Sequence, residues 1–498
     1  MLPLPSTMDF VSSVVFLVIL LGLSVAVGFM SKKKSETFNA WLVGSRNFGP
    51  VVTGLALTAT WLSGWACLGL MGIVYSFGWS GMWLAGVWTL VGIIPTVTIF
   101  GPKLRNRFEQ MKATTVPQLV GAIYNSKGIA ALACIIYVLL LLVYCVGQYK
   151  AAATAWHIVT GTSWELSIFV SALVMAVYMA VGGYTGTQWA LAIQGFFIAF
   201  ACTLLSIMAL AMVGGVDGLN LALAQQDPKL IQPLRADLSA KPNLQFAADL
   251  IGLTATLGLF VTMAVGFPHN VARFIGLRKI TRRDLTIMTA VVFVTASVPW
   301  FNLLTGLSAR ALFQSELFSI ATVKQDAAGP IVALALGSPI SGFYIAAVFA
   351  AAISTLAGMV LVMSGSLTKD LIQLLKPNLS DKTLLNTARV LTILFSLIPI
   401  TWVILRPPDL LAYLMAGAAV GLGCIFFYTL AVALFWKGAH KLGAVVCMIY
   451  GFAMTVLGGY YVYTVAQWGW GNWWWATFIG CGISYFAFSK IGSRRCKE

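Results

Sequence analysis

The chain contains few charged residues. Only 9% of its 498 residues are Asp, Glu, Lys or Arg, while 59% are hydrophobic, and the mean hydropathy is +0.90. Soluble domains carry roughly 25% charged residues. The composition therefore excludes a soluble globular protein and predicts a polytopic, all-α membrane protein that lies in the lipid bilayer.

Acidic residues are the scarcest charged group, with fifteen in the whole chain, and there are three histidines. The carboxylates fall in loops or near the ends of apolar segments, and Asp249 is the deepest of them. Proton-driven transporters often place such groups at mid-membrane, so we expect no acidic relay. The sequence also lacks HExxH, GxSxG and GxxxxGK motifs and paired carboxylates. We therefore expect neither an enzyme nor a cofactor, and no use of ATP.

The eight cysteines form no CxxC pair or metal-type cluster, and we interpret them as packing residues.

The net charge of +16 comes from 31 basic residues, which sit in short loops between apolar segments. This is the positive-inside pattern, so nucleic acid is not an expected partner. Most basic residues fall on one side if the N-terminus is outside. We predict an inner or plasma membrane of bacterial type, with the C-terminus in the cytoplasm.

About thirteen apolar segments are long enough to be membrane helices. We place them at residues 10–30, 51–77, 79–100, 129–149, 164–183, 187–213, 245–267, 285–310, 339–366, 388–405, 409–436, 442–464 and 472–489. Two loops on the outer side are long. Residues 214–244 are expected to form an irregular lid, and residues 311–339 to hold a short surface helix.

The segment at residues 51–76 has an unusual centre, where Thr58, Thr60, Ser63 and Gly64 replace the expected apolar residues. Hydroxyls and glycine at mid-depth allow a helix to break, as in many transporter sites. They also allow a tightly packed continuous helix. A similar Leu-Thr-Ala-Thr run recurs at residues 253–256, and polar-interrupted segments in corresponding positions indicate an inverted repeat. Chance similarity explains this run equally well.

An ion can be held by carbonyls and hydroxyls where no carboxylate is present, because sodium is a hard cation that prefers oxygen ligands. Ser354 and Thr355 are adjacent hydroxyls in an alanine-rich segment. Either they help to bind an ion, or each bonds back to a carbonyl of its own helix.

Several motifs follow one another along the chain in an order that resembles the sodium:solute symporter family. They are LVGSR at 42–46, ATWLSG at 59–64, YMAVGGYTGTQWALAIQ at 178–194, GFPH at 266–269 with Arg273, and AAIST at 351–355 followed by Lys369 and Asp370. The resemblance implies a LeuT-like core of five plus five helices that works by alternating access. It places one transporter domain over residues 1–498, with repeats at 51–213 and 245–436 and extra helices at 10–30, 442–464 and 472–489.

The same resemblance implies two groups of site residues. Sodium would bind the carbonyls of Ala59, Leu62 and Ala351 and the hydroxyls of Ser354 and Thr355. The residues that bind or gate the solute would be Trp61, Ser63, Trp65, Phe260 and Met263.

Two positions depart from the family pattern. Several members have an acidic or amide residue where this chain has Trp61, and an aspartate where it has Leu191. These changes imply a single sodium ion per cycle. Trp61, together with RPPD at 406–409, is closest to the pantothenate and monocarboxylate branch.

The expected function is sodium-coupled uptake of a small organic solute, a carboxylate such as pantothenate or a monocarboxylate. The alternatives are a proton-coupled symporter of the same fold and a transporter-like membrane sensor. The expected partners are the solute, the sodium ion and the bilayer, and the protein is expected to be a monomer or a weak homo-oligomer.

Overall fold

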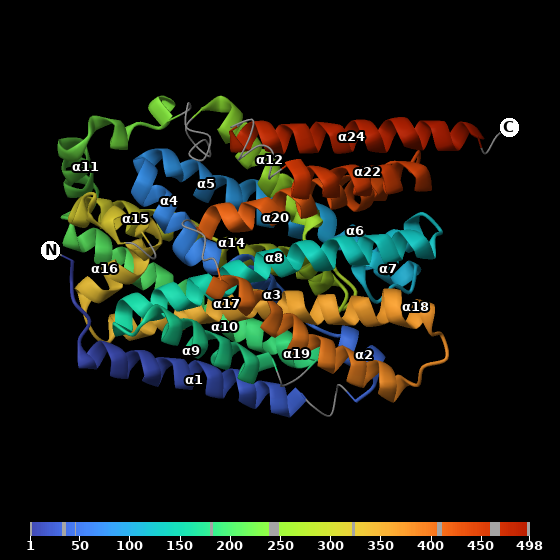
Figure 1. The fold of residues 1–498 in the computed structure, drawn as a ribbon, viewed down its shortest axis with the longest axis horizontal. Coiled ribbons are helices and arrows are strands. Elements are labelled where there is room, and N and C mark those ends of the chain that lie inside the picture. Colours follow the sequence, from blue (N-terminus) through green and yellow to red (C-terminus); the bar gives the residue numbers. More distant parts are fainter. Residues whose placement is uncertain are drawn as a thin grey trace.

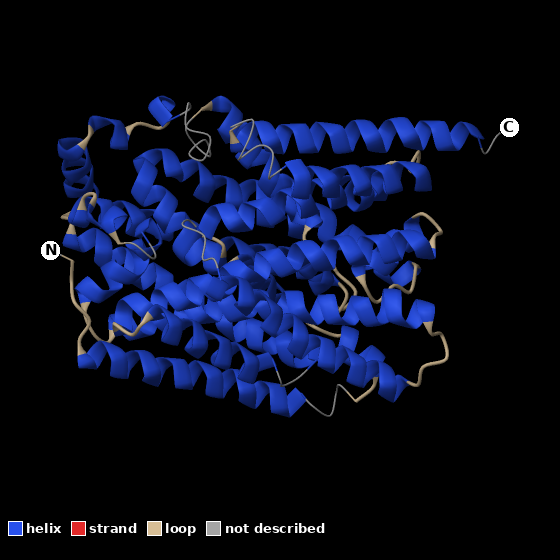
Figure 2. Ribbon diagram, in the orientation of Figure 1, coloured by secondary structure: helices blue, strands red, loops and turns tan. Residues whose placement is uncertain are grey.

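The computed structural model describes residues 2–31, 36–44, 46–179, 183–238, 249–320, 324–405, 411–458 and 469–495. This part of the chain is almost entirely helical, and its only β pairing is an isolated bridge between Phe48 and Leu277 (Figure 2). The prediction of an all-α protein is confirmed. Gly182 of the double glycine and the motif at 406–409 lie outside the described residues.

Helices of different lengths make up the bundle (Figure 1). They are α1 (Thr7–Ser31), α8 (Lys127–Thr160), α9 (Trp164–Met179), α10 (Gly183–Met212), α14 (Arg282–Thr295), α15 (Val298–Phe313), α17 (Ile340–Ser366), α19 (Asp381–Leu405), α20 (Leu411–Phe426), α22 (Lys441–Ala453) and α24 (Trp470–Arg495). Every expected apolar segment overlaps a described helix. By length and composition, the described residues contain 9 helices able to cross a membrane, or up to 10 if a bent pair is one span.

The predicted break in the first core segment is confirmed. α3 (Pro50–Trp61) ends before Leu62, and the chain resumes as a π-helical turn (Trp65–Gly69) that leads into α4 (Leu70–Phe77). The break falls within the hydroxyl- and glycine-containing stretch at residues 58–65. Backbone of this kind is tolerated inside a membrane protein only where it is buried or lines a cavity.

The second broken segment differs from the prediction. α12 (Leu250–Gly266) runs without interruption through the Leu-Thr-Ala-Thr run, and the hydroxyl of Thr256 bonds back to the carbonyl of Gly252 at 2.8 Å within that helix. The break lies at Phe267, and the helix beyond it, Pro268–Phe274, is bent by 48°. Pro268 causes this break, because a residue that precedes proline is driven out of the helical region.

α17 forms the centre of the bundle. It contacts α1, α8, α10 and α19, and its most apolar stretch of 18 residues is 100% buried. α1 and α24 lie at opposite edges of the bundle in Figure 1. The first core helix, α3, packs on α10 and also contacts α17, so its broken end lies beside the middle of the central helix.

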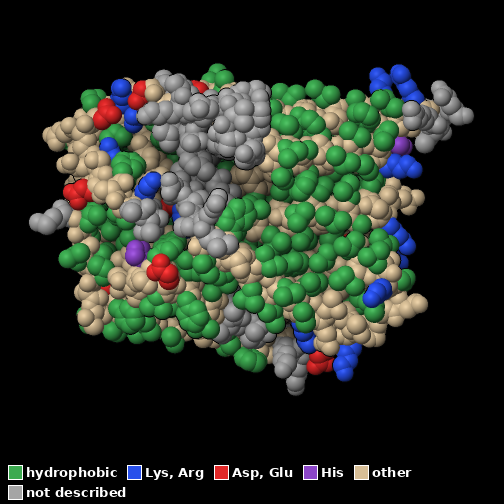
Figure 3. Space-filling view, viewed as in Figure 1, with side chains coloured by type: hydrophobic (Ala, Val, Ile, Leu, Met, Phe, Trp, Pro, Cys, Tyr) green, Lys and Arg blue, Asp and Glu red, His purple; other side chains and the backbone are tan. Residues whose placement is uncertain are grey.

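The two ends of the bundle differ in charge. In Figure 3, the end where α24 finishes shows mostly lysines and arginines with little acidic surface, and both signs of charge are mixed at the opposite end. α1 begins at the opposite end from the one at which α24 finishes (Figure 1). An odd number of crossings, as predicted, gives this arrangement of the termini.

The described parts of both long loops, residues 214–238 and residues 311–339 without 321–323, contain more helix than predicted. The first contains α11 (Gly215–Gln226) and two short 3-10 helices, Pro228–Ile231 and Ala236–Leu238. The second contains the 3-10 helix Lys324–Ala327 and α16 (Ala328–Leu336), whose residues are largely buried rather than on the surface. Asp326 of this segment forms a buried ion pair with Lys150, with 3.2 Å between Nζ and Oδ2.

Candidate functional site

The break after α3 releases carbonyl groups from the helical hydrogen-bond ladder, and those of Ala59 and Thr60 are two of them. In a continuous helix the amides of Ser63 and Gly64 would bond the carbonyls of Ala59 and Thr60. Here the amide of Ser63 donates to the carbonyl of Trp61 at 2.9 Å, and that of Gly64 donates to the side-chain oxygen of Gln148 at 3.0 Å. The oxygens of Ala59 and Thr60 are therefore available to other partners.

The predicted hydroxyls of α17 face these two carbonyls. Ser354 Oγ lies 2.8 Å from the carbonyl oxygen of Ala59 and 3.0 Å from that of Ala351, and Thr355 Oγ1 lies 3.3 Å from that of Thr60. We call these five oxygens the oxygen cluster. The structure thus brings together four of the five predicted sodium ligands and adds Thr60.

The fifth predicted ligand, Leu62, lies at the break itself. Its amide donates to Thr58 at 2.7 Å, and the amide of Ala66 bonds Ser63 at 2.9 Å instead of Leu62. Its carbonyl is thus also released from the helical ladder, but the two α17 hydroxyls contact Ala59 and Thr60. The sequence signal for Thr60 was present, because it belongs to the same ATWLSG motif as Ala59.

The oxygen cluster is buried and consists of uncharged groups. Ala59, Ala351 and Ser354 have no exposed surface, and Thr355 and Thr60 are 1% and 2% exposed. Carbonyl and hydroxyl oxygens are suitable ligands for a hard cation. The chemistry of the cluster therefore fits a small cation such as sodium, which would be cargo of the protein.

α8 supports the break from the other side. Gln148 is fully buried, and its side-chain oxygen accepts the hydrogen bond from the amide of Gly64. This oxygen replaces the carbonyl acceptor that the amide would have in a continuous helix. A Cβ atom on Gly64 would lie 2.4 Å from the Cβ of Ala151. Glycine is therefore required here by the close approach of the broken helix to α8. The sequence offered no indication that Gln148 has this role.

A pocket with aromatic walls lies beside the break. The ring of Trp65 stacks on that of Trp88, with 5.1 Å between centroids, and Phe260 lies 5.9 Å from Trp65 and 5.5 Å from Trp88. The lining is otherwise mostly aliphatic or sulfur-containing and includes no charged side chain. Its residues are Trp65, Leu84, Trp88, Tyr144, Thr256, Leu259, Phe260, Met263, Met415, Ala416 and Ala419.

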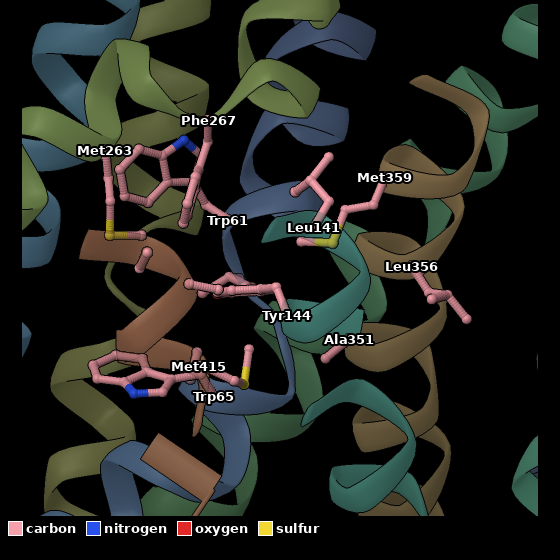
Figure 4. Packing of buried hydrophobic residues seen from close by; sticks show 14 of the residues in the cluster. Trp61, Trp65, Leu141, Tyr144, Met263, Phe267, Ala351, Leu356, Met359 and Met415 are labelled. Carbon is pink, nitrogen blue, oxygen red and sulfur yellow. The ribbon is translucent and has the colours of Figure 1, made fainter. Parts of the chain in front are cut away.

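Three of the five predicted solute residues line this pocket: Trp65, Phe260 and Met263. Trp61 is not in its lining but packs against Trp88 at 5.9 Å. In Figure 4, Trp61 lies with Met263 and Phe267 on one side of Tyr144, and Trp65 lies with Met415 on the other. Ser63 is also outside the lining, and its hydroxyl accepts a bond from the amide of Trp65 at 3.3 Å.

The sequence did not identify Trp88, Tyr144 or Met415 as pocket residues. Each is one apolar residue within an apolar segment, and only the packing of the helices shows which side chains meet. The pocket and the oxygen cluster lie on either side of the break, because Trp65 lines the pocket and Thr60 belongs to the cluster. This arrangement places oxygen ligands suited to a cation next to an apolar pocket.

Comparison with known proteins assigns the chain to a family. The model of the sodium:solute symporter family matches residues 41–451. The sodium/proline symporter of Escherichia coli is 27% identical over 457 residues, which cover 89% of this chain and 86% of that protein. The E. coli sodium/pantothenate symporter is 26% identical over 454 residues, or 88% of each chain.

A solved structure shows the same fold. It is the substrate-bound, outward-open state of a Na+-coupled sialic acid symporter, with a TM-score of 0.76, 17% sequence identity and 98% coverage of both chains. The fold of the present chain is accordingly LeuT-like. With a family model that matches most of its length, the chain belongs to the sodium:solute symporter family.

Proposed function

We propose that this protein takes up a small organic carboxylate together with sodium. One observation supports the proposal most strongly: the carbonyls of Ala59 and Thr60, which the break releases, face the two hydroxyls of α17. Sodium-coupled symport of a small solute is also what membership of the family supports. The division into repeats at 51–213 and 245–436 is part of the same proposal.

Sodium is favoured over a proton by the chemistry of the oxygen cluster. Its oxygens are carbonyls and hydroxyls, which do not titrate near neutral pH. A proton-coupled cycle needs a group that gains and loses a proton, usually an intramembrane acidic residue or histidine. The residues that face one another at the break provide ligands for a cation and no such group.

A sodium ion bound in the oxygen cluster would couple sodium binding to solute binding, because it would join two helices. The cluster combines carbonyls of α3 with hydroxyls of α17, so a bound cation would hold the broken end of α3 against the central helix. Trp65, which follows the break, lines the pocket. Binding of sodium thus favours one arrangement of the pocket, and by linkage the solute must increase the affinity for sodium equally.

The pocket suggests the class of solute. Its aromatic and methionine side chains suit an apolar body, and its lining has no charged side chain that could pair with an ammonium or a carboxylate group. A sodium ion in the neighbouring oxygen cluster would supply a positive charge for a carboxylate, whereas the lining supplies no negative charge for an ammonium group. This favours a carboxylate such as a monocarboxylate or pantothenate over a zwitterion such as proline. Relatives named for proline and for pantothenate are about equally similar to this chain, so the pocket is the basis of this choice.

Uptake by purified protein in proteoliposomes tests the proposal. Labelled pantothenate, lactate, pyruvate, acetate, proline and glucose would be offered under an inward sodium gradient, an inward proton gradient or neither. We expect a carboxylate to accumulate only under the sodium gradient. Accumulation under the proton gradient alone would contradict sodium coupling, and binding without uptake would indicate a sensor.

A further inference from the structure

The side chain of Arg273 is fully buried next to the oxygen cluster. Its Nη2 atom lies 2.7 Å from the position that a Cβ on Gly358 would occupy, and Thr60 Cγ2 lies 3.6 Å from the same point. Gly358 follows Ser354 by four residues, so the two lie one turn apart on the same face of α17. The guanidinium group therefore sits against α17 and near α3, one helical turn beyond the hydroxyl of Ser354.

Neighbouring groups hold Arg273 in this position. Its Nε donates to the carbonyl of His269 at 3.2 Å, and its Nη1 donates to the side-chain oxygen of Gln188 at 3.1 Å. Tyr184 of α10 donates to the carbonyls of Ala272 and Arg273, both at 3.1 Å. Its ring centroid lies 5.8 Å from the guanidinium carbon. The residues after the second break are thereby fixed to α10.

A second cavity lies further along α17 than the oxygen cluster, beside the residue that precedes Arg273. Its lining includes Tyr184 and Ala272 and, from α17, Leu361, Val362 and Ser366. These α17 residues come after Gly358, and the helix then continues to the basic residues Lys369 and Lys376. Along α17 the order is thus the oxygen cluster, the guanidinium group, the cavity and the basic end of the molecule.

We propose that Arg273 is the inner gate for sodium, a proposal that rests on the proposed function. The guanidinium group occupies the path from the oxygen cluster to the second cavity, so it must move before a cation can leave toward the basic end. Arginine stays charged at every physiological pH, and its charge opposes the passage of a second cation at this short distance. The guanidinium group fits against α17 because Gly358 has no side chain there.

The flux of radioactive sodium into proteoliposomes without solute tests the gate. We expect Arg273→Met to raise this flux by about tenfold or more, because both the obstruction and the charge are reduced. Arg273→Lys should restore most of the barrier. Adding Ser354→Ala and Thr355→Ala to Arg273→Met should abolish the extra flux, which would show that the ions pass through the oxygen cluster.

Arg278→Met is the matched control. Arg278 is five residues further along, its side chain is 50% exposed, and it pairs with Asp284 at 2.6 Å, so its loss should leave the solute-free flux unchanged. Should Arg273→Met not insert, Gly358→Ala provides the second variant, because its new Cβ would displace the guanidinium group. We expect it to raise the flux as well.

The gate and the symport function can fail separately. Arg273→Met and Gly358→Ala could show the same solute-free sodium flux as the wild type while their uptake still requires sodium. In that case the proposal that Arg273 is a gate would be wrong, and the proposal of sodium-coupled symport would be unaffected. If uptake by the wild-type protein does not depend on sodium, the proposed function is wrong, and the gate is wrong with it.

Discussion

Gly64 connects the local sequence to the site most directly. It follows the end of α3 by three residues, its amide bonds Gln148, and a Cβ there would meet Ala151 of α8. The flexible backbone of glycine is a lesser factor, since φ at Gly64 is −52° and lies in the ordinary helical region. Glycine is required at position 64 because there is no room for a Cβ atom between the break and α8.

We predict that Gly64→Ala abolishes sodium-driven uptake while the protein still inserts. The added Cβ would lie 2.4 Å from Ala151 and 3.3 Å from the oxygen of Gln148, so the broken end of α3 must move away from α8. Uptake and the amount of protein in the membrane would be measured together. The control is Gly49→Ala, since nothing lies within 4 Å of a Cβ there. Normal uptake by Gly64→Ala would contradict this account of the break.

A second prediction at this scale concerns the pocket. Trp88 stacks on Trp65 and is 2% exposed, so Trp88→Leu removes one wall of the pocket without touching the oxygen cluster. We expect the KM for solute to rise about tenfold, because an aromatic pair and buried apolar area are lost. The sodium concentration for half-maximal uptake, measured at saturating solute, should change little. A larger change for sodium than for solute would argue against the division between pocket and ion site.

An ion pair joins two elements that are far apart in sequence. It forms between Lys150 of α8 and Asp326 of the 3-10 helix Lys324–Ala327. Both side chains are 0% exposed. A Cβ on Gly72 of α4 would lie 3.1 Å from Asp326 Oδ1. This segment therefore packs closely on α4, the helix after the break, while it is tied to α8.

We predict that Asp326→Asn lowers the free energy of unfolding in detergent by about 3 kcal/mol or more, because it leaves the buried ammonium group facing a neutral partner. Lys150→Met combined with Asp326→Leu should recover most of this loss. Glu109→Gln is the control: its side chain is 60% exposed and pairs with Arg105 at 3.0 Å, and such surface pairs contribute about 1 kcal/mol or less. Equal losses in Asp326→Asn and Glu109→Gln would contradict the role of the buried pair.

Sequence reasoning succeeded where a local motif determines the structure, and it failed where side chains meet across the fold. The ATWLSG motif located the first break, and the Ser-Thr pair located the facing hydroxyls. The Lys150–Asp326 pair joins positions 176 residues apart, and no local pattern in the sequence indicated it. At the second break the local signal was Pro268, whereas the threonine run suggested a break about three turns too early.

At the scale of the whole molecule, the distribution of basic residues predicts the orientation in the membrane. Lys229 lies in the first outer loop and Lys376 follows α17 at the basic end. In a background without Cys496, Lys229→Cys should react with an impermeant maleimide on intact cells, and Lys376→Cys only after permeabilisation. The seven described cysteines are buried and should not interfere. The opposite labelling pattern would reverse the proposed orientation.

The sodium dependence of uptake in variants of the oxygen cluster tests the central claim most directly. Each hydroxyl bonded to a charged group contributes about 1.5–3 kcal/mol. Ser354→Ala and Thr355→Ala should therefore each raise the sodium concentration for half-maximal uptake by about tenfold or more, and the double variant should raise it further. Thr368→Ala is the control, because its buried hydroxyl bonds Ser364 within the same helical segment at 2.8 Å. A double variant with the sodium dependence of the wild type would contradict the assignment of sodium to this cluster.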